Sequence, residues 1–319
     1  MHNRLCFMLI PRQQQRGRIP FRAPPSKLLL VLGVILIYFV MTGNYLNLRG
    51  GSSSHSNNNN VSVVTTTYYP DTSDIRFNLA IELCKLAAKH NIHLIIVDGS
   101  PDFPSIKEQF EAAGGNQHVR VFQQNEKRFV GKGGSLKQAI LMATRWFQQN
   151  DIDSKDAAIV FTEPEKVDLM NHINDITKPI FDGNAEVIIP TREGKLFKAT
   201  YPIEQYHSES FGNLHFNLLA NRHENFASKK LDWLFGPFAM NAKLASSWLE
   251  YKGTSWDAQI IPYVRGVKSG WRIEQVEINF KHAPEMKQQE EGDEGFTRKR
   301  LHQLNLLFEL LGDKELATT

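Results

Sequence analysis

Short apolar runs alternate with segments of helical periodicity through the middle of this chain, and this alternation is the strongest constraint on its fold. The runs suited to β-strands lie at residues 94–97, 119–122, 157–161 and 185–190. The segments with apolar side chains at helical spacing are residues 75–87, 105–113, 131–147 and 167–180. Strands that alternate with helices predict an α/β domain with a mainly parallel sheet.

Two of the predicted strands end in acidic side chains. Asp98 follows residues 94–97, and Glu163 and Glu165 follow residues 157–161. Ligands of open α/β sheets bind outside the carboxyl ends of the strands, so we expect these carboxylates to face one crevice. The two strand ends therefore suggest a nucleotide-sugar site.

The formal net charge of +3 is concentrated at the start of the 319-residue chain. Residues 1–27 contain no acid and six basic side chains, namely Arg4, Arg12, Arg16, Arg18, Arg22 and Lys27. The remainder is slightly acidic and has no interleaved aromatic and basic motif. We therefore expect no nucleic acid partner.

An apolar run at residues 28–46 is long enough to cross a membrane, at about 28 Å of helix against a bilayer core of about 30 Å. A cleaved signal peptide and an uncharged core helix are the alternatives, although no small-residue cleavage site is evident after Val40. Positive charges before the run predict a cytosolic N-terminus. The sequence thus predicts a single-pass type II membrane protein of the Golgi or endoplasmic reticulum, with a cytosolic tail at 1–27 and a lumenal domain.

Residues 47–73 include a Gly, Ser and Asn-rich stretch and are predicted to be a flexible stem. The triplet Asn60-Val-Ser62 is a glycosylation sequon within it. A single domain is expected at residues 74–312, followed by a tail at 313–319. An anchor would separate Cys6 from Cys84, so no internal disulfide is expected.

The glycine-rich segment Gly131-Lys-Gly-Gly-Ser135 opens one predicted helix. A helix N-terminus favours a diphosphate, and glycines allow a ligand to approach the backbone. A glycine turn with a capping serine explains this segment equally well. The spacing of a Walker phosphate loop is absent.

Six short motifs follow one another in an order that resembles the GT-A glycosyltransferases. They are Val97-Asp-Gly-Ser100, Gly131-Lys-Gly-Gly-Ser135, Glu163-Pro-Glu165, Phe235-Gly-Pro-Phe238, Thr254-Ser-Trp-Asp257 and Phe280-Lys-His282. The resemblance covers residues 75–285 and is greatest to the family-2 type and its mannosylglycerate-synthase-like branch. It implies a single Rossmann-like domain that moves a sugar from GDP-mannose or a UDP-sugar to the hydroxyl of an acceptor that the sequence does not identify.

The resemblance also implies a donor site. Asp98 matches the first-strand acid that lies near the base and ribose, and Gly99 and Ser100 follow it. Lys132 and Gly133 are expected near the phosphates. Arg192, just after the fourth predicted strand, offers a further charge for a phosphate or an acidic acceptor. The alternative for Asp98 is that it caps the turn that follows.

The resemblance implies a divalent metal site for Mg²⁺ or Mn²⁺, with Glu163, Glu165 and His282 as ligands. The chain departs from the usual Asp-x-Asp pattern, because longer side chains flank Pro164 and Lys166 follows at once. Three alternatives remain. The glutamates hold a metal, Lys166 neutralises part of the negative charge of the diphosphate leaving group, or the triplet is a plain exposed loop.

The acceptor side of the site is implied by three further segments. Asp257 aligns with the general base of many inverting members, and Trp256 beside it would supply a drier pocket. Asp232, Trp233 and Gly236 are expected to form an acceptor wall. Alternatively, Asp257 is an acidic residue in the first turn of a helix, where the helix dipole favours it. The segment with Asp232, Trp233 and Gly236 would then be a core strand with a tight turn.

Two other functions compete with the transferase. The missing Asp-x-Asp favours a GT-A-like binding or scaffold subunit that lacks catalysis. A nucleotidyltransferase on a similar sheet is less well supported, because a glycine- and arginine-rich loop near the first strand is absent.

Overall fold

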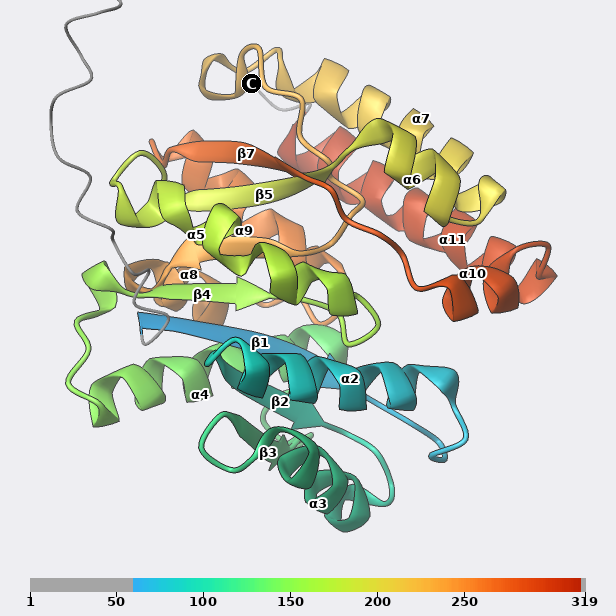
Figure 1. Cartoon of the computed structure of the whole chain (residues 1–319). Coiled ribbons are helices and arrows are strands. Elements are labelled where there is room, and N and C mark those ends of the chain that lie inside the picture. Colours follow the sequence, from blue (N-terminus) through green and yellow to red (C-terminus); the bar gives the residue numbers. More distant parts are fainter. Residues whose placement is uncertain (1–59, 317–319) are drawn as a thin grey trace, which may run out of the picture. The chain divides into compact units, whose positions relative to one another are not determined.

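Seven strands form one mixed sheet in the computed structural model, which describes residues 60–316 apart from the side chains of residues 313 and 314 (Figure 1). The strands are β1 (Val61–Thr67), β2 (His93–Asp98), β3 (Val119–Gln123), β4 (Ala158–Phe161), β5 (Val187–Arg192), β6 (Phe238–Asn241) and β7 (Ile273–Ile278). Their order is β3-β2-β1-β4-β6-β5-β7. Strand β6 is antiparallel to both neighbours and the other pairs are parallel, which confirms the predicted α/β class.

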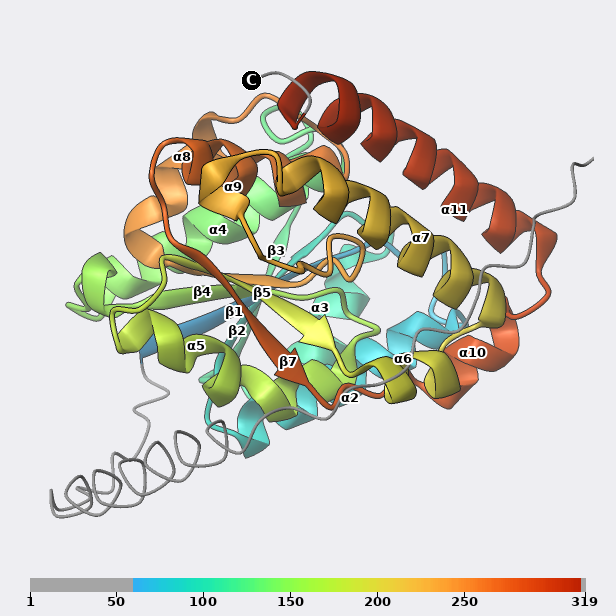
Figure 2. The same cartoon turned by 90° about the horizontal axis from the view of Figure 1, so that it is seen from above.

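Helices cover both faces of the sheet. They are α2 (Ile75–Lys89), α3 (Phe103–Gly114), α4 (Gly131–Gln149), α5 (Ile173–Phe181), α6 (Gly194–Thr200), α7 (Ile203–Ala220), α8 (Ala245–Glu250), α9 (Asp257–Lys268), α10 (Pro284–Glu290) and α11 (Glu294–Leu307). A π-helical segment, Phe308–Glu315, continues α11. Figure 2 shows α4, α8 and α9 on one side of the sheet and α2 and α5 on the other.

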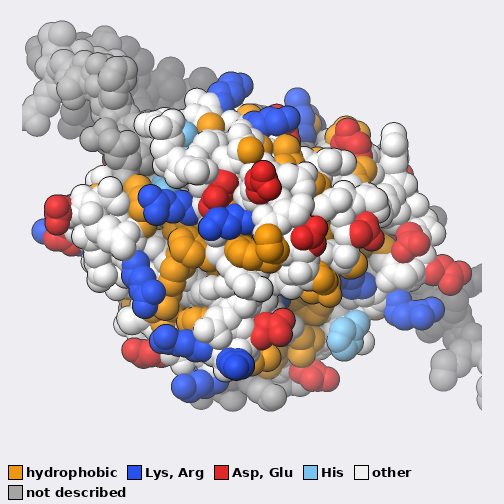
Figure 3. Space-filling model, turned by 90° about the horizontal axis from the view of Figure 1, so that it is seen from below, with side chains coloured by type: hydrophobic (Ala, Val, Ile, Leu, Met, Phe, Trp, Pro, Cys, Tyr) orange, Lys and Arg blue, Asp and Glu red, His pale blue; other side chains and the backbone are white. Residues whose placement is uncertain are grey.

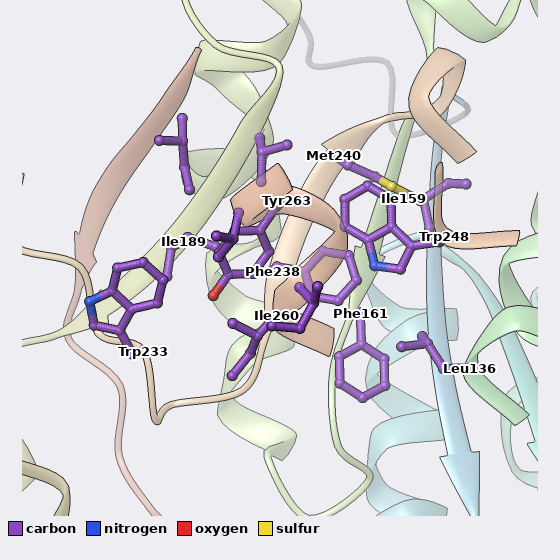
Figure 4. Packing of buried hydrophobic residues seen from close by; sticks show 14 of the residues in the cluster. Leu136, Ile159, Phe161, Ile189, Trp233, Phe238, Met240, Trp248, Ile260 and Tyr263 are labelled. Atoms are coloured by element: carbon purple, nitrogen blue, oxygen red, sulfur yellow. The ribbon is translucent and has the colours of Figure 1, made fainter. Parts of the chain in front are cut away.

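Strands β2, β4 and β6 are buried on both faces, whereas the edge strands β3 and β7 include exposed or half-buried residues. In β2, Leu94 and Ile96 join the core under α2 and α3, and Ile95 and Val97 join the core under α4. Figure 4 shows the second core, in which the rings of Phe238 and Trp248 stack at 5.1 Å between centroids. Burial of apolar area on both faces, at about 25 cal/mol per Å², stabilises the sheet.

The structure corrects the predicted start of the domain, because β1 lies inside the segment that was expected to be a flexible stem. Strand β1 is the centre of the parallel part of the sheet, between β2 and β4. Six of its seven residues are β-branched, and such side chains favour a buried strand. Ser62 of the sequon is fully buried in this strand. The domain therefore begins before residue 74.

The predicted cytosolic tail (1–27), the predicted anchor (28–46) and the first part of the predicted stem lie outside the described residues, as do residues 317–319. Within residues 60–316, no helix combines the length and apolar character that a membrane crossing requires.

Charged side chains of both signs are interspersed on the face shown in Figure 3, which is the lower face of Figure 1, where α3 lies. Apolar side chains lie between them in small groups. Exposed apolar atoms of this kind are normal on a protein surface.

His93 on β2 makes the stability of the domain depend on pH. Its ring is 5% exposed, stacks on Trp146 at 3.9 Å between centroids and shares a hydrogen bond with Ser62. Burial, followed by the positive charges of Arg120 and His118, lowers the pKa of His93 to about 3. The unfolded chain has a histidine pKa of about 6.5, so below that pH it binds a proton that the folded state does not. We expect the free energy of unfolding to fall by about 2 kcal/mol between pH 7 and pH 5.

Urea denaturation at the two pH values measures this loss of stability. The His93→Phe variant keeps an aromatic ring against Trp146 and should lose most of the pH dependence. His302→Gln, on the exposed side of α11, is the matched control and should retain it. If the free energy of unfolding of His93→Phe falls between pH 7 and pH 5 as much as that of the wild type, other groups cause the pH dependence.

Candidate active site

A cavity of about 460 Å³ opens at the carboxyl ends of β1 and β4. Strand β1 pairs with β2 on one side and with β4 on the other, so the strand order reverses at this point. The cavity lies at this reversal, because residues 66–70, at and just after the end of β1, and residues 163–165, after β4, line it. Such a topological switch point is where open α/β sheets bind their ligands.

The cavity also receives side chains from helices that are distant in sequence. Its complete lining is Thr66, Thr67, Tyr68, Tyr69, Pro70, Arg76, Gln124, Glu126, Gly131, Lys132, Ser135, Glu163, Pro164, Glu165, Trp256, Lys299, Arg300 and Gln303. The first turn of α4 supplies residues 131, 132 and 135, and α11 supplies residues 299, 300 and 303. Four of the predicted site residues are therefore brought together: Lys132, Glu163, Glu165 and Trp256.

The cationic side chains of the lining outnumber its three carboxylates. Arg76, Lys132, Lys299 and Arg300 lie there together. The surrounding protein atoms, followed by the positive charges of Arg300 and Arg76, lower the pKa of Lys299. This crowding of positive charge suits the cavity to an anionic ligand.

Glu163 is held between two lysines. Lys132 Nζ lies 2.6 Å from Glu163 Oε1, and Lys166 Nζ forms an ion pair with Glu163 Oε2. Burial acts to raise the pKa of Glu163, but the charges of Lys132 and Lys166 outweigh it and hold that pKa well below its usual range. Glu163 is therefore ionised, and the three side chains together carry one positive charge.

Gly236 allows the backbone to approach this cluster. Its φ of +97° is strained for other residues, and a Cβ atom there would lie 3.3 Å from Glu163 Oε2. Gly236 thus lies behind Glu163, although it does not line the cavity.

Glu165 differs from Glu163 in its surroundings. Its side chain lines the cavity and is partly exposed. Across residues 60–316 it makes no hydrogen bond or ion pair with another side chain. Its carboxylate is therefore free to meet a ligand.

The three predicted metal ligands do not come together, which corrects that expectation. His282 is 6% exposed, stacks on Tyr201 at 4.3 Å and lies 3.5 Å from Glu290 Oε2, away from the cavity lining. Both oxygens of Glu163 already contact ammonium groups. Among residues 60–316, no group of three or more His, Cys, Asp or Glu side chains has the arrangement of a metal site.

Asp98 is the last residue of β2, and it is fully buried. Because β1 precedes β2 in the chain, Asp98 does not end the first strand, as the resemblance implied. It accepts hydrogen bonds from Thr67 Oγ1 at 2.9 Å and from the Ser100 backbone N–H and hydroxyl at 3.0 and 2.6 Å. Burial raises the pKa of Asp98, and these hydrogen bonds offset only part of the increase. Asp98, Gly99 and Ser100 do not line the cavity. The structure supports the turn-capping alternative, and their contact with a nucleotide stays a prediction.

Gly133 brings α4 close to the loop before α9. Its N–H donates to Thr254 O at 2.9 Å, and a Cβ atom there would lie 2.8 Å from the Ala258 Cβ. The glycine is needed for this packing, and it does not line the cavity. Of this segment, Gly131, Lys132 and Ser135 line the cavity.

Arg192 corrects a second expectation, because its side chain is only 1% exposed and cannot reach a donor phosphate. It donates two hydrogen bonds of 2.8 Å to Asp232, and its Nη1 lies 2.8 Å from Glu209 Oε2. Asn213 donates to Asp232 as well, at 2.6 Å. Asp232, predicted on the acceptor side, thus belongs to a buried ion network with Arg192.

Trp233 is also a core residue. It is 1% exposed, and its indole N–H donates to Asn217 Oδ1 at 3.0 Å. Figure 4 shows it among the apolar side chains of the core. Trp233 is therefore part of the core, as in the alternative to the predicted acceptor wall.

Asp257 begins α9 with a buried side chain. Its Oδ2 accepts a 2.7 Å hydrogen bond from the Tyr251 hydroxyl, and its Oδ1 accepts from the Ser255 N–H at 3.0 Å. Trp256 lines the cavity and Asp257 does not. Both carboxylate oxygens stabilise the loop before α9, and the base role of Asp257 stays a prediction.

Sequence reasoning missed two parts of the cavity. The first is the exit of β1, with Thr66, Thr67 and the two tyrosines that follow, because β1 itself was missed. Its run of β-branched residues ending before Pro70 was the available signal. The second is the contribution of α11, for which the local sequence holds no signal.

No protein-family model matches this chain, and a search of the curated proteins found no match. Similar solved structures include glucosyl-3-phosphoglycerate synthase from Mycobacterium tuberculosis, at 16% identity and a TM-score of 0.48 over 77% of this chain and 79% of that one. They also include the mannosyltransferase PcManGT from Pyrobaculum calidifontis in complex with GDP-Man and Mn²⁺, at 12% identity and a TM-score of 0.40 over 79% and 65%.

A third similar structure is 4-diphosphocytidyl-2C-methyl-D-erythritol synthase from Anaerococcus prevotii, at 10% identity and a TM-score of 0.41 over 77% of this chain and 98% of that one. Two of the three names describe enzymes that handle a glucosyl or mannosyl group, and the third describes a diphosphocytidyl compound. Scores this low do not decide a function, which is therefore argued from the site.

Proposed function

We propose that this protein transfers a sugar from a nucleoside diphosphate sugar to an acceptor hydroxyl. The observation that carries the proposal is the cation-lined cavity at the switch point between β1 and β4. Its volume of about 460 Å³ is in the range of small-molecule and cofactor sites. GDP-mannose and UDP-sugars are the donor classes proposed.

The lining offers a partner for each part of such a donor. Lys132 lies in the first turn of α4, where the positive end of the helix dipole also favours a diphosphate. Tyr68, which is 58% exposed, and Trp256 offer aromatic faces for a base or a sugar ring. Phosphate recognition and ring stacking together favour a sugar nucleotide over a simple anion.

Glu165 is the carboxylate best placed to take the proton of the acceptor hydroxyl. It lines the cavity without a hydrogen bond or ion pair to another side chain, although its charge acts on Arg76 and Lys166 nearby, whereas both oxygens of Asp257 are hydrogen-bonded within the protein. A general base must reach the proton that it removes. We assign this role to Glu165 in preference to the prediction for Asp257.

A transfer assay on the full chain tests the proposed function. The purified protein is incubated with GDP-mannose or UDP-hexoses and a panel of hydroxyl acceptors, and the released nucleoside diphosphate is measured. We expect release that depends on one donor and increases with an acceptor. No release above background with any pair of donor and acceptor would contradict the proposed transfer.

A sugar-nucleotide-binding subunit without catalysis is the second candidate, favoured by the internal hydrogen bonds of Asp257. Calorimetry that detects donor binding, together with no turnover for any acceptor in the panel, would support it. The proposed location, on the evidence of residues 1–46 alone, is the lumenal side of a Golgi or endoplasmic reticulum membrane.

A further inference from the structure

Two buried or half-buried lysines hold the carboxylate that follows β4. Lys166 is 8% exposed at its side chain, Glu163 17% and Lys132 34%. Lys166 also lies over the ring of Phe235, 5.6 Å from its centroid. Lys132 is the member of this cluster that faces the cavity together with Glu163.

This arrangement does not fit a divalent cation. Each Glu163 oxygen accepts a hydrogen bond from an ammonium group, so a metal ion at this carboxylate would have to displace an ammonium group or bind beside two of them. Two ammonium groups beside the carboxylate would also repel a cation. Of the three predicted ligands, only Glu165 remains free to coordinate, and one carboxylate is a weak site.

We propose that Lys132 and Lys166, held together by Glu163, neutralise the diphosphate leaving group in place of a divalent metal. The inference rests on the proposed function and names the groups that make its chemistry work. Glu163 offsets the repulsion between the two lysines and leaves one net positive charge in the cluster. One of the three N–H donors of Lys132 meets Glu163, so the other two can donate to phosphate oxygens.

The lysines act on the bond that breaks. The bond between C1 of the sugar and the oxygen of the β-phosphate breaks, and its electron pair stays on that oxygen. The acceptor oxygen forms the new bond to C1, and the acceptor proton moves to the Glu165 carboxylate. The departing diphosphate gains one negative charge, which Lys132 meets directly and Lys166 stabilises from behind. Arg76, Lys299 and Arg300 add positive charge around the same cavity.

Isothermal titration calorimetry on the full chain tests the proposal with inorganic diphosphate, UDP and GDP as probes. Each is titrated once in EDTA and once in Mn²⁺. We expect binding in EDTA that Mn²⁺ improves by less than about threefold. Lys132→Met should weaken diphosphate binding in EDTA by about 10–100-fold, as expected for the loss of a charged hydrogen-bond donor.

Two further variants complete the design. Lys85→Met removes a lysine that is 57% exposed on α2 and should leave binding unchanged. Glu163→Gln keeps both lysines and should retain diphosphate binding in EDTA, whereas loss of a metal ligand would abolish Mn²⁺-dependent binding. Circular dichroism checks that each variant is folded, and the metal dependence of the wild-type chain needs no variant at all.

The outcomes separate this inference from the proposed function. Binding of UDP or GDP that requires Mn²⁺ and disappears in EDTA would overturn the lysine proposal and leave the transferase standing. No binding of any nucleotide in either buffer would overturn both. Binding in EDTA that Lys132→Met does not weaken would also overturn the role of Lys132.

Discussion

Replacing Arg192 with methionine should lower the free energy of unfolding by about 3–5 kcal/mol, because it leaves the buried Asp232 without its counter-charge and Glu209 with only Arg300, at 3.6 Å. Asp232 and Glu209 both lie 2.8 Å from the guanidinium and are at most 6% exposed at their side chains. Methionine fills much of the arginine volume but donates no hydrogen bond. Urea denaturation at pH 7 measures the effect.

A surface arginine gives the matched control. Arg265 forms an ion pair with Glu315 at 2.6 Å but is 59% exposed, so Arg265→Met should cost no more than about 1 kcal/mol. A cost for Arg192→Met as small as that of the control would show that the buried network relaxes when its cation is removed. A double variant, Arg192→Met with Asp232→Asn, should recover part of the loss because one of the uncompensated charges is gone.

Replacing Glu165 with glutamine should lower kcat by about 10²–10⁴-fold, because the amide cannot accept the acceptor proton. Glu165 lies in the cavity lining without a partner, so the isosteric change should leave the fold intact. Affinity for the nucleoside diphosphate should not fall, since the variant removes a negative charge near the phosphates. Steady-state kinetics with a saturating donor, together with calorimetry of UDP and GDP, separate the two quantities.

Asp257→Asn is the comparison that decides between the two assignments of the base. Asparagine can still accept from the Ser255 N–H, so the loop before α9 should persist, and kcat should change by less than about threefold. A large fall in kcat for Asp257→Asn with full activity in Glu165→Gln would restore Asp257 as the base. It would also show that the loop rearranges when the donor binds.

The alternation of strands and helices made the α/β class predictable from local sequence. The spacing of apolar side chains located α2, α3 and α4 well. Glu163 and Glu165 were predicted because they follow a strand, and Lys132 and Trp256 were predicted from the resemblance to the GT-A family. Strand β1 was missed because a Ser and Asn-rich stretch leads directly into it, although its β-branched content favours a strand.

The partners of charged residues were not predictable. The sequence places Arg192 after a predicted strand, where it could face a ligand. It does not show that Asp232 and Glu209 would enclose the guanidinium. The sequence also places Glu163 after β4. It does not show that Lys132, 31 residues earlier, would form an ion pair with it. Such contacts depend on how distant elements pack, and periodicity within one element carries no information about that.

The central position of β1 determines where the rest of the chain joins the domain. Six residue steps of about 3.3 Å separate Val61 from Thr67, so the start of β1 is about 20 Å from the rim of the cavity. The polypeptide that precedes residue 60 is therefore attached at the amino edge of the sheet, on the opposite side from the carboxyl edge where the cavity opens. In the proposed transfer, the acceptor would therefore bind at the edge of the sheet opposite to the one at which β1 begins.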